Sequence, residues 1–453
     1  MFNNILEKKN TPNQWSKSTM TLLYKKGDRA NLNNYRPISL MSNVYKVFSK
    51  IILGRLTKNL DENQPREQAG FRKNYSTIDH IHVVTQLIEK CNEFGKTLYI
   101  CFIDFTKAFD SLEHNAIWEA LRNQNVEEEY IEILYSIYSK IRSKIRLERV
   151  GTEFSINKGV RQGDPLSPKI FSAVLEMVFR NINWTNQGVK IDGEFLTHLR
   201  FADDIAIFAE DSKQLENMIK DLERESKKVG LSLNASKTKI LTNNREQPIR
   251  VNDQDIEYVK EYIYLGQSIS FKDQTEKEID RRIAIAWKKF WSLKEIMKNR
   301  EVNIDVKSKL FNIVILPCLT YGCQTWSLRK KDEDKLAIHQ RKMERSMLGI
   351  KITDKIRNET IRSKTKVADI LQKIRMLKWN WAGHVIRMDN GKWTNKITEW
   401  QPREGQRKRG RPRKRWEDIF KEKCGLDWRR KARDRDTWRR LGEAYAKEAT
   451  STS

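Results

Sequence analysis

Hydrophobic and polar positions of this 453-residue chain follow strand patterns at three places in its first half. Residues 98–105, LYICFIDF, are an almost unbroken run of apolar side chains and predict a buried strand that ends at Asp104. The stretch LRFADDIAIF, residues 199–208, places apolar arms on both sides of adjacent acids, which predicts a strand, a turn and a second strand. The segments KIRLERV and EFSINKGV, on either side of Gly151, predict a hairpin.

Helical spacing of apolar residues predicts the elements between these strands. Helices are expected over 36–60, over 112–140, after Pro165 and Pro168, and over 211–229, where Gly230 ends the last one. In the first helix the expected core-facing positions are Val44, Val47, Phe48, Ile51, Ile52 and Leu56. The order of elements predicts an α+β fold in which helices cover one face of an antiparallel sheet. Past residue 271 the chain is predicted to be helical and basic.

Composition adds a partner and a compartment to this picture. The chain is too long for one ordinary core, and 87 Lys and Arg against 60 Asp and Glu give a net charge of +27, which favours a polyanion such as nucleic acid. Its five cysteines form no C-x-x-C pair, so neither a disulfide scaffold nor a zinc knuckle is expected. No apolar stretch reaches the roughly 18 residues that span a bilayer. A soluble protein of the cytosol or nucleus, without a membrane partner, is therefore expected.

The acids at the strand ends are the candidate chemistry. If the strands of Asp104 and of the pair Asp203 and Asp204 are neighbours, their carboxylates converge at one edge of the sheet. Two like charges about 4 Å apart repel by about 4 kcal/mol at an effective dielectric constant near 20, so the cluster is tolerable only if it is protonated or holds a cation. Hard oxygen ligands favour Mg²⁺, with Mn²⁺ as an alternative. A solvated acidic turn is the other interpretation.

Seven short motifs in fixed order resemble those of the reverse transcriptases, most closely those of non-LTR (LINE-type) retrotransposons. They are NYRPISL (34–40), EQAGFRKNYST (67–77), FIDFTKAFDSL (102–112), GVRQGDPLSP (159–168), FADD (201–204), GLSLNASKTKIL (230–241) and YLG (264–266). The resemblance covers about residues 20–320. It implies a right-hand polymerase with fingers, palm and thumb. The expected regions are 1–97, an N-terminal extension and fingers; 98–258, palm with remaining fingers elements; 259–325, primer-grip hairpin and thumb; and 326–453, a basic, mostly helical nucleic-acid-binding region.

The resemblance also implies roles for the acids and their neighbours. Asp104 and Asp203 are expected to be shared ligands of two Mg²⁺ ions, with Asp204 in support of the second ion. Phe109 is expected to stand under the incoming sugar, where its ring would exclude a ribose 2′-hydroxyl. Core packing is the other interpretation of this ring. Gln162 and Gly163 are expected beside the nucleotide, although a plain turn before a helix would look the same.

Four cationic residues and one hairpin complete the implied site. Arg36, with Lys25 or Lys26 upstream, resembles a clamp on the triphosphate, because a guanidinium can grip phosphate oxygens in pairs. Lys237 resembles the lysine that approaches the departing pyrophosphate as a general acid. Each could instead be a solvated surface charge. The YLG motif resembles the hairpin that holds the primer end, through Tyr264 and Gly266.

The C-terminal part is basic and rich in tryptophan. Residues 401–440 hold 17 Lys and Arg against seven Asp and Glu, and seven of the 13 tryptophans lie between Trp379 and Trp438. Such rings stack on bases or pack in a core, and the sequence leaves both interpretations open. The stretch RKRGRPRKR, 407–415, resembles an AT-hook that contacts DNA through Arg409, Arg411 and Arg413, and also a nuclear-localisation signal, which favours the nucleus.

The leading hypothesis is an RNA-directed DNA polymerase with an RNA template, a DNA primer or target DNA, and dNTPs as partners. The alternative is a catalytically inactive, element-derived nucleic-acid-binding protein. An RNA-copying RNA polymerase is disfavoured by Phe109. The chain is expected to lack the endonuclease that precedes the polymerase in full-length elements, a ribonuclease H domain, and the Cys/His knuckle that often follows the thumb. The oligomeric state is left open.

Overall fold

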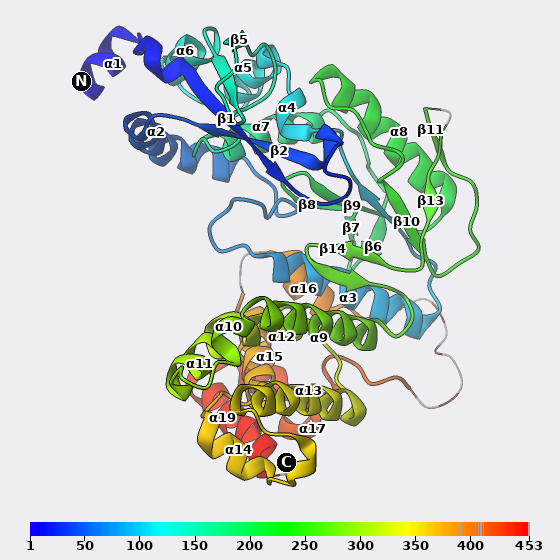
Figure 1. The fold of residues 1–453 in the computed structure, drawn as a ribbon. Coiled ribbons are helices and arrows are strands. Elements are labelled where there is room, and N and C mark those ends of the chain that lie inside the picture. Colours follow the sequence, from blue (N-terminus) through cyan, green and yellow to red (C-terminus); the bar gives the residue numbers. More distant parts are fainter. Residues whose placement is uncertain are drawn as a thin grey trace. The chain divides into compact units, whose positions relative to one another are not determined.

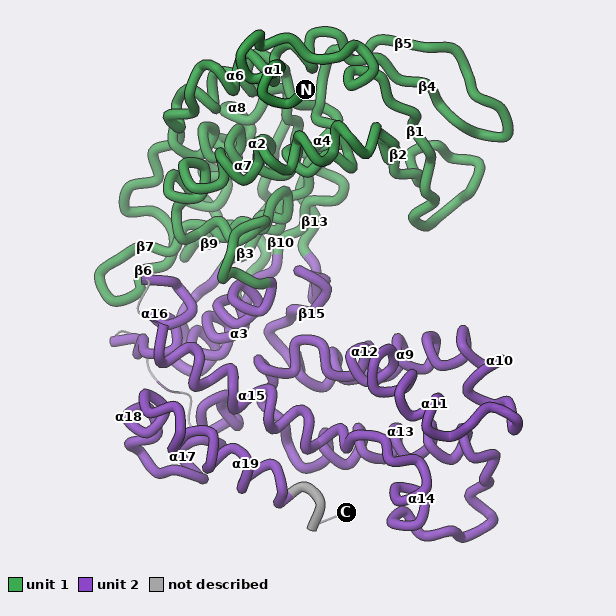
Figure 2. Tube along the Cα trace, turned by 90° about the vertical axis from the view of Figure 1, so that its left-hand side faces the viewer, with its two compact units in different colours: residues 1–76, 99–240, 244–258 green, residues 77–98, 241–243, 259–453 purple. Residues whose placement is uncertain are grey.

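The computed structural model describes residues 1–252, 254–388, 391–403, 405, 407, 410 and 412–451, and the chain divides into two compact units (Figure 2). Unit 1 comprises 1–76, 99–240 and 244–258; unit 2 comprises 77–98, 241–243 and 259–453. Helix α3 (Thr77–Phe94) therefore belongs to unit 2, although the segments before and after it belong to unit 1. The domain boundaries expected from the sequence stay predictions.

A five-stranded sheet is the centre of unit 1 (Figure 1). Its strand order is β13 (Glu257–Tyr258), β10 (Lys239–Thr242), β3 (Tyr99–Ile103), β9 (Asp204–Ala209) and β8 (His198–Phe201). All five residues of β3 are buried, as expected for an apolar strand between two neighbours. Helix α8 (Ser212–Lys228) packs on β3 and β9, while α7 (Ser167–Arg180) packs against α8, α2 (Asn43–Glu62) and α5 (His114–Arg122). The predicted α+β class and the strand–turn–strand around FADD are confirmed.

The second sheet of unit 1 has the order β2 (Tyr35–Leu40), β1 (Lys17–Tyr24), β4 (Arg142–Arg146) and β5 (Phe154–Ser155). Strands β4 and β5 form the predicted hairpin, but β1 pairs with β4 in parallel, as β10 does with β13, which the sequence pattern did not predict. The other elements of unit 1 are α1 (Phe2–Lys8), α4 (Ala108–Ser111), α6 (Glu128–Tyr138), β6 (Val189–Ile191), β7 (Glu194–Leu196), β11 (Arg250–Val251) and β12 (Gln254–Asp255).

The helix expected over 36–60 begins later and faces the core with fewer residues. Residues 35–40 are strand β2, because Pro37 has no backbone donor and biases Arg36 towards extended backbone, and α2 begins at Asn43. Three of the six expected core positions are wrong: Val44, Val47 and Ile51 are 47%, 53% and 40% exposed. The core contacts only the stripe of α2 that holds the buried Phe48, Ile52 and Leu56.

From residue 259 on, the described part of unit 2 is helical apart from the hairpin of β14 (Tyr262–Tyr264) and β15 (Gln267–Ile269). A first core lies among its earlier helices, and a second lies among the later ones. The α-helices that unit 2 contains besides α3 are α9 (Gln274–Ser292), α10 (Lys294–Met297), α11 (Ile304–Leu310), α12 (Leu316–Thr320), α13 (Lys330–Leu348), α14 (Asn358–Thr365), α15 (Ile370–Arg387), α16 (Trp393–Glu399), α17 (Asp418–Cys424), α18 (Trp428–Arg433) and α19 (Arg435–Ser451). In the part of the chain that is described, no helix combines the length and the apolar character that crossing a membrane requires.

Tryptophans form the second core of unit 2. Trp379 on α15 and Trp438 on α19 stack with ring centroids 4.4 Å apart, and the indole of each donates to the backbone carbonyl of the other at 2.8 Å. Six of the seven tryptophans between 379 and 438 are at most 3% exposed: Trp379, Trp393, Trp400, Trp416, Trp428 and Trp438. For these six rings the core-packing interpretation is correct, because a ring buried in this way has no face free for a base.

Helix α3 is fixed within unit 2 by residues from near the end of the chain. It lies beside α16 in both views (Figures 1 and 2), and the ring of His82 hydrogen-bonds the Thr398 hydroxyl at 2.8 Å. Glu89 accepts from the backbone N–H of Trp416 at 2.9 Å. These contacts join positions more than 300 residues apart in sequence.

Candidate active site

The central sheet of unit 1 brings the three acids to one edge. Ile103 on β3 pairs with Ile205 on β9, so the next positions, Asp104 and Asp204, end up opposite each other. Phe201 pairs with Asp204 across the β8–β9 hairpin, which leaves a two-residue turn at positions 202 and 203. The acids of two motifs about a hundred residues apart therefore converge where two adjacent strands meet.

Charge and burial act together on these carboxylates. Burial raises the pKa of Asp104, and the charge on Asp203 raises it further, against an opposing effect of Lys237. Burial also raises the pKa of Asp203, which Arg36 and Lys25 lower. Partial burial and then repulsion from Asp203 and Asp104 raise the pKa of Asp204 from 3.8 to about 6, although the residue keeps an exposed edge. The cluster therefore holds negative charge that the protein itself compensates only in part.

The loop after α8 carries Lys237 to the acids. The backbone N–H of Asn234 donates to the carbonyl of Asp104 at 2.8 Å, and the N–H of Asp104 donates to the Thr238 hydroxyl at 3.3 Å. With the loop fixed to the end of β3, the Lys237 ammonium lies 3.8 Å from Asp104 Oδ2, while most of its side chain stays exposed. The Lys237 side chain, which is exposed to solvent beside the acids, can therefore bind an anionic ligand there.

Two more cations from the β1–β2 hairpin act on the same cluster. Lys25 directly follows β1, and its N–H donates to the carbonyl of Asn34 at 2.8 Å, just before Arg36 on β2. Burial lowers the pKa of Lys25, and the cations Arg36 and Lys237 lower it further, while Asp110 and Asp104 raise it. Lys25, Arg36 and Lys237 thus add positive charge that acts on the acids, and a polyphosphate needs such charge around it.

Phe109 and Gln162 lie on neighbouring segments of the same unit. The Phe109 ring on α4 is partly buried and stacks on Phe171 of α7 with centroids 4.4 Å apart. Gln162 Nε2 donates to Asp110 Oδ1 at 2.9 Å, and the backbone carbonyl of Gln162 accepts from the Ser39 N–H at 2.8 Å. Burial raises the pKa of Asp110, and the bond from Gln162 lowers it.

Gly163 occupies a position that only glycine fits. Its φ is +114°, and a Cβ there would lie 2.9 Å from the carbonyl oxygen of Ser39. The strand β2, which carries Arg36, can therefore approach the segment of Gln162 closely. Asp110 was not predicted to have a role. The one signal for it in the sequence was its position directly after Phe109.

The donor set fits a hard divalent cation, but the acids are not drawn together as a finished site. Across the described residues, no three His, Cys, Asp or Glu side chains gather closely enough to form a ready-made metal centre. All the same, the ligand atoms at this edge are carboxylate oxygens, and Asp104 Oδ2 is buried without a hydrogen-bond partner in the described structure, with the exposed Lys237 ammonium 3.8 Å away. A buried carboxylate oxygen that accepts no hydrogen bond, beside two further acids, is the chemistry that Mg²⁺ or Mn²⁺ satisfies.

The remaining predicted residues lie elsewhere. Tyr264 and Gly266 belong to unit 2, where Tyr264 is 2% exposed and Gly266 forms the β14–β15 turn with φ of +75°. Arg409 and Arg411 lie outside the described residues, and Arg413 is exposed. The structure thus brings the catalytic and nucleotide-binding candidates of unit 1 together, and the hairpin and hook candidates belong to other parts of the chain.

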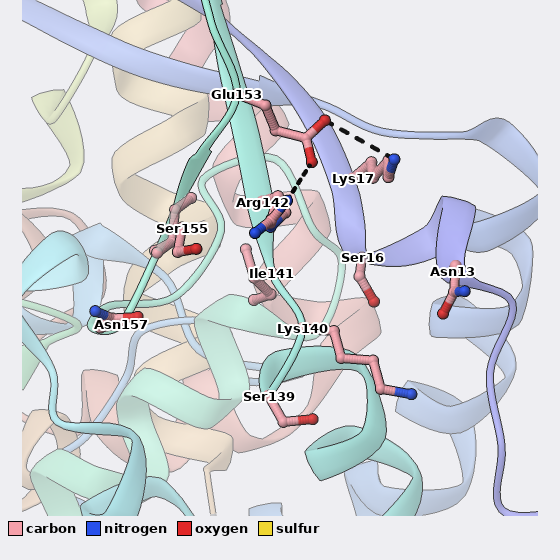
Figure 3. A pocket seen from close by; sticks show the side chains of 11 residues that line it. Asn13, Ser16, Lys17, Ser139, Lys140, Ile141, Arg142, Glu153, Ser155 and Asn157 are labelled. Atoms are coloured by element: carbon pink, nitrogen blue, oxygen red, sulfur yellow. Dashed lines mark hydrogen bonds and ion pairs between the residues drawn. The ribbon is translucent and has the colours of Figure 1, made fainter.

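Unit 1 also has a pocket of about 410 Å³ that includes none of the predicted site residues (Figure 3). Glu153 lies between two cations there, 3.3 Å from Arg142 and 3.8 Å from Lys17. Its lining residues are Asn13, Ser16, Lys17, Ser139, Lys140, Ile141, Arg142, Glu153, Ser155, Ile156 and Asn157. Because Glu153 is the one acid among the described residues of this lining, against Lys17, Lys140 and Arg142, the pocket offers no carboxylate cluster, and the acids of the β3–β9 edge remain the best candidate site.

Comparisons with known proteins point the same way. The family model described as "Reverse transcriptase (RNA-dependent DNA polymerase)" matches residues 23–269. A transposon-derived protein of Caenorhabditis elegans is 32% identical over 269 residues, which are 55% of this chain and 96% of that protein. The Pol polyprotein of the R2 retrotransposable element of Nasonia vitripennis is 30% identical, over 55% of this chain and 25% of the polyprotein.

A third relative covers more of the chain. The RNA-directed DNA polymerase of the mobile element jockey of Drosophila funebris is 25% identical over 83% of this chain and 42% of that protein. The chain thus spans less than half the length of these two element-encoded proteins. Among solved structures, apo telomerase of Candida tropicalis has a TM-score of 0.46 at 12% identity, over 85% of this chain and 70% of that chain. The family resemblance expected from the seven motifs is confirmed.

Proposed function

Because the chain belongs to the reverse transcriptase family, we propose that it is an RNA-directed DNA polymerase that extends a DNA 3′-hydroxyl on an RNA template during retrotransposition. The observation that carries this proposal is the meeting of Asp104, Asp203 and Asp204 at the end of β3 and β9, inside the matched region. Membership of the family implies dependence on divalent metal ions. In our proposal these are two Mg²⁺ ions, which Mn²⁺ can replace.

Asp104 and Asp203 are the proposed shared ligands, and Asp204 supports the second ion. When bound, the ions neutralise charge on the phosphates and make the 3′-hydroxyl a better nucleophile. The raised pKa values of the three acids support this role, because burial raises all three, repulsion adds to it for Asp104 and Asp204, and a bound cation would stabilise the charged form of each. Asp104 Oδ2, which is buried and accepts no hydrogen bond, is the oxygen that a bound cation would stabilise most.

The proposed step is an in-line displacement at the α-phosphorus of a dNTP. The 3′-oxygen forms a new P–O bond and loses its proton to solvent, and the bond to pyrophosphate breaks. Lys237 donates the proton that the leaving pyrophosphate takes up, since its ammonium already lies 3.8 Å from Asp104 Oδ2. Arg36 and Lys25 hold the triphosphate by charge.

Selection of the sugar and base pair falls to α4 and the segment before α7. Phe109 would exclude a ribose 2′-hydroxyl, and its stacking on Phe171 supports a fixed ring. Gln162 and Gly163 would lie along the nucleotide, held by the bonds of Gln162 to Asp110 and Ser39. We further propose that Tyr264 and Gly266 belong to a primer-holding hairpin, and that the basic stretch 407–415 binds DNA and directs the protein to the nucleus.

Primer extension on an RNA template with Mg²⁺ and dNTPs tests the proposal. The wild type should extend the primer, and Asp203→Asn should leave no detectable product. Asp255→Asn is the matched control, since Asp255 is an exposed acid of the same unit paired with Arg250 at 2.7 Å. Extension by Asp203→Asn at the control rate would refute the site, and no extension by the wild type would favour the nucleic-acid-binding alternative.

A further inference from the structure

The motif EQAGFR, residues 67–72, runs beside the strand that leads into the acidic turn. The N–H of Arg200 on β8 donates to the carbonyl of Glu67 at 2.8 Å, and the N–H of Ala69 donates to the carbonyl of Arg200 at 2.9 Å. Gln68 and Arg200 form a parallel bridge. This segment is therefore bridged to the β8 edge at Gln68, within a few residues of Asp203.

The side chain of Gln68 reaches from this bridged segment to the turn itself. Gln68 is fully buried, and its Oε1 accepts from the N–H of Ala202 at 3.2 Å and from the N–H of Gly70 at 2.8 Å. Ala202 and Asp203 are the two turn residues between β8 and β9. A single carboxamide oxygen thus accepts from the backbone N–H of the residue directly before Asp203, a proposed metal ligand.

The turn needs such a partner because its backbone is unusual. Ala202 has a φ of +58°, while Asp203 does not have a positive φ. A positive φ at the first of two hairpin residues is the arrangement in which glycine is usual, and alanine adopts it at a cost in free energy. The turn is therefore not fixed by local preference alone, and an outside hydrogen bond contributes to its geometry.

Gly70 also lies against the turn, and its lack of a side chain allows this close contact. A Cβ at Gly70 would lie 2.4 Å from the backbone nitrogen of Ala202 and 3.0 Å from the carbonyl carbon of Phe201. Its φ is not left-handed, so glycine is required there for the close approach and not for the backbone angle. Arg72 donates to the carbonyl of Gln68 at 2.9 Å, which holds the segment in place.

We propose that Gln68 is a positioning residue that fixes the Ala202–Asp203 turn and, through it, the carboxylates that hold metal for nucleotidyl transfer. The inference rests on the proposed polymerase function and extends it to a residue outside the acid cluster. Gln68 acts through the turn, and Gly70 allows it to come close enough.

Gln68→Met tests this with a matched control, Gln124→Met. Methionine keeps the volume of glutamine and suits a fully buried position, but it offers the Ala202 N–H no carboxamide acceptor. Gln124 is equally buried in unit 1, at 1% exposure, and donates to the carbonyl of Ala173 at 2.8 Å without contacting the turn. Both variants lose one buried amide, so a difference between them reports on the turn.

Two measurements separate positioning from loss of stability. The first is Mn²⁺ binding to the full chain, followed by the electron paramagnetic resonance signal of the free ion. We expect Gln68→Met to weaken Mn²⁺ binding and lower kcat of primer extension by about 10- to 100-fold, as for residues that orient metal ligands. The KM for dNTP should change much less than kcat, and Gln124→Met should match the wild type in both assays.

The second measurement is hydrogen exchange of the peptide spanning the β8–β9 turn, which should be faster in Gln68→Met than in Gln124→Met. Equal exchange, Mn²⁺ binding and kcat in the two variants would overturn the proposal. If Gln68→Met does not fold, Gly70→Ala applies the same test, because its methyl group pushes on the Ala202 nitrogen. A wild type that binds Mn²⁺ but does not extend primers would refute the polymerase function alone, since Mn²⁺ binding and exchange test Gln68 without turnover.

Discussion

Removing one charge from the acid cluster should stabilise the metal-free protein. Asp204→Asn removes the cost of burying a charge and, next to it, the repulsion from Asp203 and Asp104. The rise of the pKa of Asp204 from 3.8 to about 6 corresponds to about 3 kcal/mol at 1.36 kcal/mol per pKa unit. Because Asp204 is an exposed residue, solvent screens its charge and the real cost is well below about 3 kcal/mol. We therefore expect Asp204→Asn to raise the free energy of unfolding by about 1 kcal/mol.

The sign follows from proton binding. The folded protein holds the Asp204 proton more tightly than the unfolded chain, so the unfavourable contribution is absent below pH 3.8. It grows as pH rises towards about 6 and is complete above that value. The gain in Asp204→Asn should therefore be full at pH 8 and about half as large at pH 5.

Urea denaturation in EDTA at pH 5 and pH 8 measures this gain, with Glu119→Gln, an exposed acid on α5, as the control that should show none. Saturating Mg²⁺ should reverse the order, because an ion at 100 times its Kd stabilises the wild type by about 2.7 kcal/mol and the variant by less. The reasoning would be refuted if Asp204→Asn were not more stable in EDTA at pH 8, or if Mg²⁺ stabilised both proteins equally.

Three further substitutions address other parts of the chain. Phe109→Val removes the ring that stacks on Phe171 and should raise ribonucleotide incorporation relative to dNTP by about 10-fold or more; an unchanged ratio in competition assays would exclude the proposed role. Lys237→Ala should slow the chemical step by about 10²- to 10⁴-fold in single-turnover kinetics, and an unchanged step would remove the general acid. Trp416→Ala should cost about 3–5 kcal/mol of stability because its ring is fully buried, whereas RNA affinity measured below the unfolding transition should stay the same; selective loss of RNA affinity would argue for base contact.

Local pattern was enough to predict the elements that form the site. The apolar runs around Asp104 and around Asp203 are strands, and one pairing between those strands is enough to bring the acids to one edge. Lys237 and Gln162 carry no such pattern of their own, and their positions near the acids come from loop contacts that only the folded chain contains.

The errors have a common physical origin in contacts distant along the sequence. Val44, Val47 and Ile51 have helical spacing, but spacing cannot say how wide a stripe of α2 the core covers. The C-terminal tryptophans are equally compatible with a surface or a core until α15 and α19 are seen to pack. The sequence gives no sign of the role of Gln68 beyond its place in a motif, because its contact with Ala202 spans 134 residues.

The place of α3 within unit 2 has a consequence during synthesis. His82 and its hydrogen-bond partner Thr398 are 316 residues apart. At about 5–20 residues per second the ribosome needs about 15–60 s to make the intervening chain. During that time α3 is outside the ribosome, while the segment around Thr398 that packs on it has not yet been made. A nascent chain of this protein should therefore bind chaperones through α3, and release should await translation of the segment that holds Thr398 and Trp416.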